Sequence, residues 1–134
     1  MSKQVAVILS GCGVQDGSEI YETTLTLLRL DQLGIGYRCF APNIDQHDVI
    51  DHRNGESQSE ERRNVLVESA RLARGDVAPL EELEADEFDA VILPGGFGVA
   101  KNLSTFAEDG ADLVIQAGLG EALADFYEDR KPIG

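Results

Sequence analysis

Two short apolar runs, each followed at once by a glycine-rich turn, constrain the fold of this chain more than any other feature. Residues 4–9 and 88–93 are the runs, and Val, Ile, Leu, Ala and Phe supply most of their side chains. An apolar run of this length is typical of a strand buried on both faces of a parallel sheet. Helical patterns separate the strand patterns along the chain. The sequence therefore predicts an α/β protein with a doubly wound parallel sheet and helices on both faces.

The remaining elements are predicted from periodicity and from the residues that begin and end helices. Ser18 is the expected cap of the first helix, and Gly34 its end. Ser57 and Glu60 have the spacing of a capping box for the second helix. Residues 131–134 match the start of one more strand. The further strands are expected at residues 36–41 and 76–80, and the helices at residues 18–34, 57–75, 99–106 and 119–127.

Composition limits the domain count and the classes of partner. The 134 residues fit a single domain, residues 1–134, and 43% hydrophobic with 27% charged residues is the balance of a soluble globular protein. The formal net charge of −14 repels phosphate backbones and anionic lipid headgroups, so nucleic acid and membrane are not expected partners. Residues 1–4 lead straight into a strand without the apolar region of a signal peptide, which indicates a cytosolic, or cytoplasmic, protein.

Both glycine-rich turns, residues 11–17 and 95–98, follow buried strands and should lie at the carboxyl edge of the sheet, where such folds bind ligands. The backbone amides of Gly95 and Gly96 can bind a developing oxyanion, although a plain tight turn or a phosphate site would use the same residues. Glu22 lies one turn inside the first helix and can hydrogen-bond a nucleophile at that edge. Stabilisation of the helix dipole is its alternative role.

The cysteines and histidines each allow more than one role. Cys12 ends the first strand and is either a thiolate nucleophile or an inert, half-buried thiol, whereas Cys39 lies inside a strand and is expected to pack in the core. His47 and His52 occur with three aspartates in a polar segment, residues 43–55, where a weak metal site and a solvated loop are the alternatives. A solvated loop is the expectation, so no metal site is predicted.

Three segments resemble the ElbB family, described as isoprenoid-biosynthesis-associated proteins with a class I amidotransferase-like domain. They are residues 8–20, ILSGCGVQDGSEI, residues 63–75, which include RNVLVESAR and a following Arg-Gly pair, and residues 93–103, LPGGFGVAKNL. The three segments occur in the family's order, and the resemblance covers essentially the whole chain. It implies a flavodoxin-like sheet and a homodimer.

The resemblance also implies a chemistry and a place for each site residue. In the family, a cysteine on a strand-to-helix elbow is the nucleophile; Glu22 matches its acidic partner, and Gly95 and Gly96 match the oxyanion loop. Gly11 and Cys12 would complete the substrate pocket. The implied activity is glyoxalase-like, converting a small aldehyde, glyoxal, to glycolate by a cysteine thiolate without a cofactor.

The elbow cysteine of the family follows the strand that residues 131–134 are expected to begin. The domain is therefore expected to be incomplete at its carboxyl end, truncated before the nucleophile elbow, and inactive alone. Two alternatives remain open on the sequence. One is a non-catalytic binding or regulatory protein that uses the same pocket, and the weaker one is a phosphate or nucleotide binder that uses the glycine loops.

Overall fold

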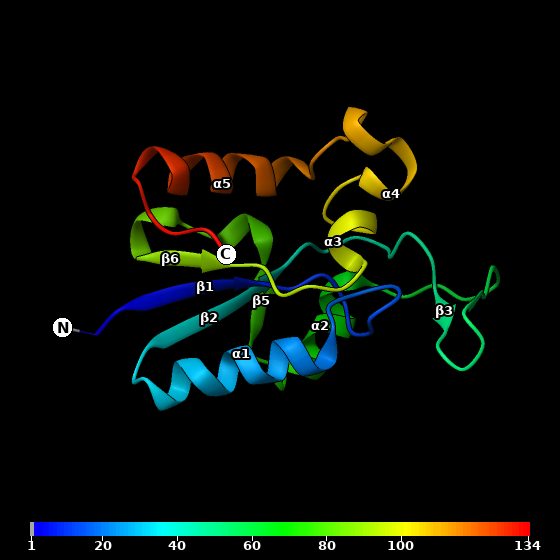
Figure 1. Ribbon diagram of the computed structural model, residues 1–134, viewed down its shortest axis with the longest axis horizontal. Helices are drawn as coiled ribbons and strands as arrows, with labels where there is room; N and C mark the ends of the chain where they lie inside the picture. The colour runs from blue at the N-terminus through cyan, green and yellow to red at the C-terminus, as the bar shows by residue number, and fades with distance from the viewer. Residues whose placement is uncertain (1) are drawn as a thin grey trace.

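The protein is described by a computed structural model that covers residues 2–134. A central parallel sheet has the strand order β5-β2-β1-β6 and lies between two helical layers (Figure 1). A two-stranded antiparallel hairpin, β3 and β4, projects from it. The strands are β1 (Gln4–Ile8), β2 (Gly36–Ala41), β3 (Ile50–Asp51), β4 (Glu56–Ser57), β5 (Val77–Pro79) and β6 (Ala90–Ile92).

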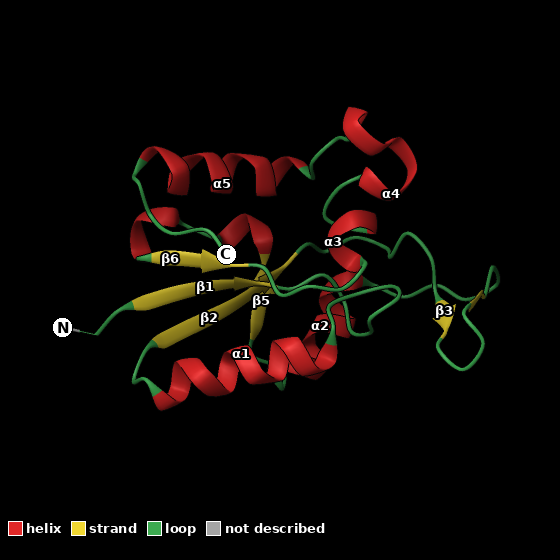
Figure 2. Cartoon of the chain, in the orientation of Figure 1, coloured by secondary structure: helices red, strands yellow, loops and turns green. Residues whose placement is uncertain are grey.

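The helices cover both faces of the sheet, with α5 on one side and α1 and α2 on the other (Figure 2). Within residues 2–134, none of them is both long and apolar enough to cross a bilayer. The α-helices are α1 (Ile20–Gln32), α2 (Val65–Ala73), α3 (Gly98–Lys101), α4 (Phe106–Asp109) and α5 (Ala117–Glu128), and the 3-10 turns are η1 (Leu80–Glu82), η2 (Ala85–Glu87) and η3 (Gly110–Asp112).

The side chains of β1 divide between the two cores because successive residues of a strand point to opposite faces. Val7 and Leu9 pack with Leu30 of α1 and Val65 of α2. Ile8 belongs to the other core, which includes side chains of β6 and α5. A strand buried on both faces explains why the run at residues 4–9 is continuously apolar. The predicted doubly wound sheet is thus confirmed.

The strands predicted at residues 4–9, 36–41, 76–80 and 88–93 are found as β1, β2, β5 and β6, and the segment expected to start another strand pairs with β6 through an isolated bridge. The peptide N–H of Val91 donates to the carbonyl of Pro132 at 3.0 Å, and that of Gly134 donates to the carbonyl of Val91 at 3.0 Å. Ile133 pairs with Val91 in the parallel sense. The segment 132–134 therefore continues the sheet beyond β6.

Ser18 does not cap the first helix, contrary to the prediction. The carboxylate of Glu19 is the cap and accepts the N–H of Glu22 at 2.6 Å. Ser18 is fully buried, and its hydroxyl accepts the N–H of Ser10 at 2.9 Å instead. A buried backbone N–H without a partner is costly, and the Ser18 hydroxyl satisfies the N–H of Ser10. The helix loses no cap, because Glu19 takes that role.

The second helix begins at Val65, eight residues later than Ser57, which lies in β4. Its cap is Asn64, whose side-chain oxygen accepts the N–H of Val67 at 2.9 Å. Residues 58–63 contain no apolar side chain that a helix could bury against the sheet. The helix predicted at residues 99–106 is also wrong, because it is split into α3 and α4.

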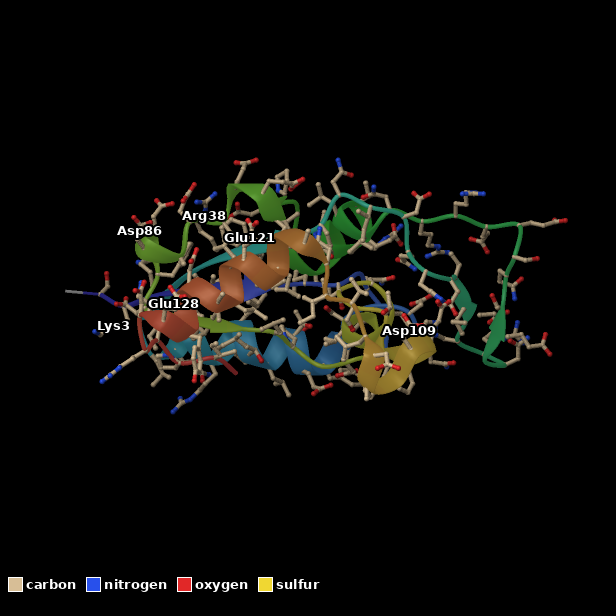
Figure 3. All side chains as sticks on the ribbon, turned by 90° about the horizontal axis from the view of Figure 1, so that it is seen from above. Lys3, Arg38, Asp86, Asp109, Glu121 and Glu128 are labelled. Atoms are coloured by element: carbon tan, nitrogen blue, oxygen red, sulfur yellow. The ribbon has the colours of Figure 1, made fainter. Side chains whose placement is uncertain are left out.

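Acidic side chains gather on the outer side of α5. Glu121 and Glu128 project from this helix, and Asp86 of η2 lies along the same side (Figure 3). Asp109 extends the acidic surface toward α4. Part of the net charge of −14 is thus displayed on this helical layer, whereas Asp16 and Glu68 are buried elsewhere.

The corrected start of α2 predicts which substitution weakens the fold. Asn64→Ala removes the cap and should lower the free energy of unfolding by about 1 kcal/mol. Ser57→Ala is the control and should change it by less than about 0.5 kcal/mol, because Ser57 is exposed in the hairpin. Urea denaturation followed by circular dichroism measures both. A larger effect at Ser57 would restore the capping box predicted from sequence.

Candidate functional site at the carboxyl edge of the sheet

The two glycine-rich turns lie against each other at the carboxyl ends of β1 and β6. The N–H of Glu19 donates to the carbonyl of Gly95 at 2.8 Å, and the N–H of Gly98 donates to the carbonyl of Gly17 at 2.9 Å. The structure therefore brings together the two loops that the sequence placed at one edge. Their backbones, rather than their side chains, make this contact.

The close contact explains why glycine is needed at two of these positions. Gly96 has φ +108°, and a Cβ there would lie 2.6 Å from the backbone nitrogen of Glu19. A Cβ on Gly98 would overlap the hydroxyl of Ser10. Loop packing alone accounts for these glycines, so their presence is not in itself evidence of an oxyanion site.

Glu22 and Gly95 meet at this edge. A Cβ added to Gly95 would lie 2.7 Å from Oε1 and 2.9 Å from Oε2 of Glu22, so the carboxylate packs on the bare Cα of the loop. Glu22 is exposed, although it lies on the first turn of α1. The predicted acid and one glycine of the predicted oxyanion loop are thus neighbours, and the carboxylate is open to a ligand.

Asn102, which the sequence analysis did not single out, ties the loops of this edge together. Its Nδ2 donates to the carbonyls of Ser10 at 2.8 Å and Asp16 at 2.9 Å, and its Oδ1 accepts the N–H of His47 at 2.8 Å. The residue is only 6% exposed. All of its polar atoms are used inside the protein, which identifies it as a positioning residue of the fold.

Lys101 makes a second connection beside Asn102. Its ammonium group donates to the carbonyl of Gln15 at 2.9 Å and pairs with the carboxylate of Asp48 at 3.1 Å. It also lies 5.8 Å from the ring centroid of Phe97. This half-buried cation holds the loop after β2 against the first glycine turn.

The polar segment 43–55 holds its histidines in separate contacts. His47 pairs with Glu108 of α4, whereas Nε2 of His52 accepts the N–H of Gln15 at 3.2 Å. Asp48 is engaged by Lys101. Within residues 2–134, no group of three or more His, Cys, Asp or Glu side chains is placed to hold a metal ion.

Cys12 lies on the other flank of the first glycine turn, next to α2. The N–H of Gly11 donates to the hydroxyl of Ser69 at 2.9 Å, which attaches the turn to this helix. Burial and the charge of Glu68 raise the pKa of the Cys12 thiol, while Arg71 opposes them. The structure therefore favours a protonated Cys12 at neutral pH, which is a poor nucleophile.

Cys39 is buried in β2, as expected of a packing residue. Burial raises its pKa to about 11. Neither cysteine in the described part of the chain thus has the environment of an activated thiolate.

The chain is similar to curated proteins over nearly its whole length. It is 50% identical over 131 residues to the mitochondrial ES1 protein homolog of Rattus norvegicus. The aligned region makes up 98% of this chain and 49% of that protein. The same values hold for the mitochondrial glutamine amidotransferase-like class 1 domain-containing protein 3 of Homo sapiens. The chain is a homologue of these ES1 and class I amidotransferase-like proteins. No protein-family model matches the chain.

A solved structure agrees with this relationship. The crystal structure of an isoprenoid biosynthesis protein with an amidotransferase-like domain, from Ehrlichia chaffeensis, has 48% identity and a TM-score of 0.92. It matches 98% of this chain and 61% of its own chain. The family resemblance and the flavodoxin-like fold predicted from the sequence are both confirmed. The homologous chain spans about half the length of the curated relatives it matches, at 49% of each.

The prediction of a cytosolic protein is contradicted, because the rat and human homologues are named as mitochondrial proteins. The prediction rested on residues 1–4, which lead into β1 without the apolar region of a signal peptide, and on the shortness of the apolar runs. Neither of these sequence features indicates the compartment of a protein. Import signals are separate segments that are removed from mature proteins and leave the fold unchanged.

The environment of Cys12 predicts slow alkylation. At pH 7.5 iodoacetamide should react with Cys12 more slowly than with glutathione, and the rate should keep rising past pH 9, because burial raises the pKa above 9.0. Glu68→Gln should accelerate the reaction by removing a negative charge, whereas the distant Glu81→Gln should not. Mass spectrometry of the Cys12 peptide measures each rate. Rapid alkylation of the wild-type chain at pH 7.5 would contradict the raised pKa.

The three hydrogen bonds of Asn102 predict a large loss of stability on truncation. Asn102→Ala leaves two carbonyls and one N–H without their partner and should lower the free energy of unfolding by about 3 kcal/mol. Ser104→Ala is the matched control nearby, because it removes one short hydrogen bond, from Ser104 Oγ to the carbonyl of Val99 at 2.9 Å, and one long one, from the N–H of Phe106 to Oγ at 3.4 Å, and should cost about 1 kcal/mol. Urea midpoints measure both. Equal effects would show that Asn102 does not hold the edge together.

Proposed function

We propose that this chain is the amino-terminal part of a glyoxalase-like enzyme that converts glyoxal to glycolate without a cofactor. The observation that carries the proposal is the contact between the exposed carboxylate of Glu22 and the bare backbone of Gly95 at the carboxyl edge of the sheet. A proton-transferring group and a glycine turn occur there side by side. Homology to amidotransferase-like proteins supports the proposal at the level of the superfamily.

The proposed reaction needs a thiolate, an acid-base group and water. The thiolate adds to one aldehyde carbon, and the resulting hemithioacetal carbon loses its proton while the neighbouring carbonyl carbon gains one. This transfer oxidises the first carbon and reduces the second, which gives a glycolate thioester. Water then releases glycolate and the free thiol. Glu22 is assigned the proton transfers, and the amides around Gly95 and Gly96 stabilise the negative oxygen.

The nucleophile is proposed to lie beyond this chain. Cys12 has a raised pKa and is attached to the α2 flank, and Cys39 is buried. Ile133 pairs in parallel with Val91, so a strand that continued past this segment would deliver its next residues to the edge at which Gly95 lies. A cysteine at that edge is proposed as the partner of Glu22.

The aldehyde substrate and the homodimer implied by the family remain proposals as well. Several apolar side chains of α1 are exposed: Tyr21 is 77% exposed, Leu25 61% and Leu28 48%. These three positions have the i, i+4, i+7 spacing of one helix face. An apolar stripe of this kind supports a proposal that α1 contributes to a contact between subunits.

We expect the 134-residue chain alone to have no measurable glyoxalase turnover, because a covalent mechanism fails without its nucleophile. Glycolate formation from glyoxal, measured with purified chain of confirmed mass, tests this. Turnover that disappears in Cys12→Ala would assign the nucleophile to Cys12 and overturn the proposal. A residual rate that survives the same substitution would indicate a contaminant.

In a full-length form of the protein, Glu22→Gln should lower turnover of glyoxal by about 100-fold or more, because the amide cannot exchange a proton. Glu19→Gln is the matched control: the same change three residues earlier affects the helix cap and should leave turnover near the wild-type value.

Steady-state kinetics and circular dichroism of the two variants decide the assignment. A folded Glu22→Gln enzyme with normal turnover would contradict the catalytic role of Glu22. A selective loss in Glu19→Gln would move that role to the capping residue.

A further inference from the structure

We propose that α1 packs against α1 of a second copy of the chain in an antiparallel contact, in which Arg29 of the partner subunit lies beside the carboxylate of Glu22. This inference deepens the subunit contact proposed above, because it gives the arrangement of the two helices and adds a residue of the partner subunit to the candidate site. It does not depend on the reaction assigned to that site.

The apolar stripe of α1 faces away from its own sheet. Successive residues of an α-helix turn by about 100°, so Tyr21, Leu25 and Leu28 lie about 140° to 160° around the helix from the buried Thr23. A neighbouring helix of the same layer would cover a flank of α1. The stripe instead lies on the outer side of α1, which forms the surface of its layer (Figure 1). It therefore fits a contact with another molecule.

The charge distribution favours this face for a contact between two copies. Acidic side chains gather on the outer side of α5, on the opposite face of the sheet (Figure 3). The charged residues of α1 are Glu22, Arg29 and Asp31, which leave the helix with a net charge of only −1. Two copies that meet through α1 keep their most acidic surfaces on the far sides of the pair, where they repel each other least.

Two charges beside the stripe are complementary to themselves under two-fold symmetry. Glu22 and Arg29 are seven residues apart and so lie on the same flank of α1. A two-fold axis beside Leu25 reverses one helix against the other, which brings Glu22 opposite Arg29 of the partner subunit. A parallel contact would put each of these charges next to its own copy, and such like-charge contacts are costly. The antiparallel arrangement is therefore the one that the charges favour.

The side chains that this contact joins are both available for it. Within residues 2–134 the guanidinium of Arg29 makes no ion pair, and it donates one long hydrogen bond, 3.4 Å from Nη1 to Oε1 of Gln32. The carboxylate of Glu22 is exposed beside Gly95. A guanidinium there stabilises the charged carboxylate, which is the form that accepts a proton. The second subunit would thus supply a positioning residue to the candidate site.

Sedimentation equilibrium of the 134-residue chain tests whether α1 forms the contact. An ionic strength of about 0.15 M limits repulsion between the acidic surfaces to about 8 Å. The wild-type chain should form a reversible dimer, and Tyr21→Glu should weaken it by about tenfold or more. Tyr127→Glu is the matched control: both tyrosines are 77% exposed, but Tyr127 belongs to α5, on the other face of the sheet. Absence of a dimer, or equal weakening by Tyr127→Glu, would overturn the proposal.

Exchange of the two charges tests the antiparallel arrangement. Glu22→Arg and Arg29→Glu should each weaken the dimer, although they change the net charge of the chain in opposite directions, and the double variant should restore it. Circular dichroism checks that each variant is folded. A double variant no tighter than the single ones would exclude the contact between these two residues and overturn the proposal. Because the measurement records mass and requires no turnover, its failure is distinct from failure of the proposed glyoxalase activity.

Discussion

The carboxyl edge of the sheet depends on the side chain of Asn102, which supplies two donors and one acceptor to three separate backbone groups. Strand ends leave carbonyls and amides that the sheet no longer pairs, and burial makes an unpaired group costly. Asn102 satisfies Ser10, Asp16 and His47 at once, from a position that is only 6% exposed. This connection helps to fix the path of the glycine turn at residues 11–17.

The strands were predictable from sequence because their signal is local. A run such as residues 4–9 is apolar at every position only when both faces of the strand are covered, so the run itself reports the helical layers. Helix caps were less predictable. Ser18 and Ser57 both have the side chain of a good cap, but one hydroxyl is needed by the buried N–H of Ser10, and the other precedes a segment with no apolar face. The first outcome depends on a tertiary contact, and the second on the lack of apolar side chains after Ser57.

The candidate site also contains features that were predictable from the sequence and features that were not. The meeting of Glu22 with Gly95 follows from topology, because parallel neighbouring strands end at one edge and the first helix starts there. The attachment of Cys12 to α2 does not follow from topology, since it depends on the path of residues 11–17 and on Ser69, far along the chain. The structural role of Asn102 could not be predicted from the sequence, in which its position in the segment LPGGFGVAKNL was the only indication.

The first glycine turn has different charged groups on its two flanks. On the β6 side, the exposed carboxylate of Glu22 lies against Gly95, and on the α2 side, Arg63 and Arg71 meet at Glu68. On the α2 flank, burial and the charge of Glu68 raise the pKa of the Cys12 thiol against the opposing charge of Arg71, so this flank does not favour an anion. The turn is attached to the loop after β6 through Gly17 and Gly98, and to α2 through Gly11 and Ser69. Glu22 and Gly95, rather than Cys12, are therefore the groups on which the proposed site depends.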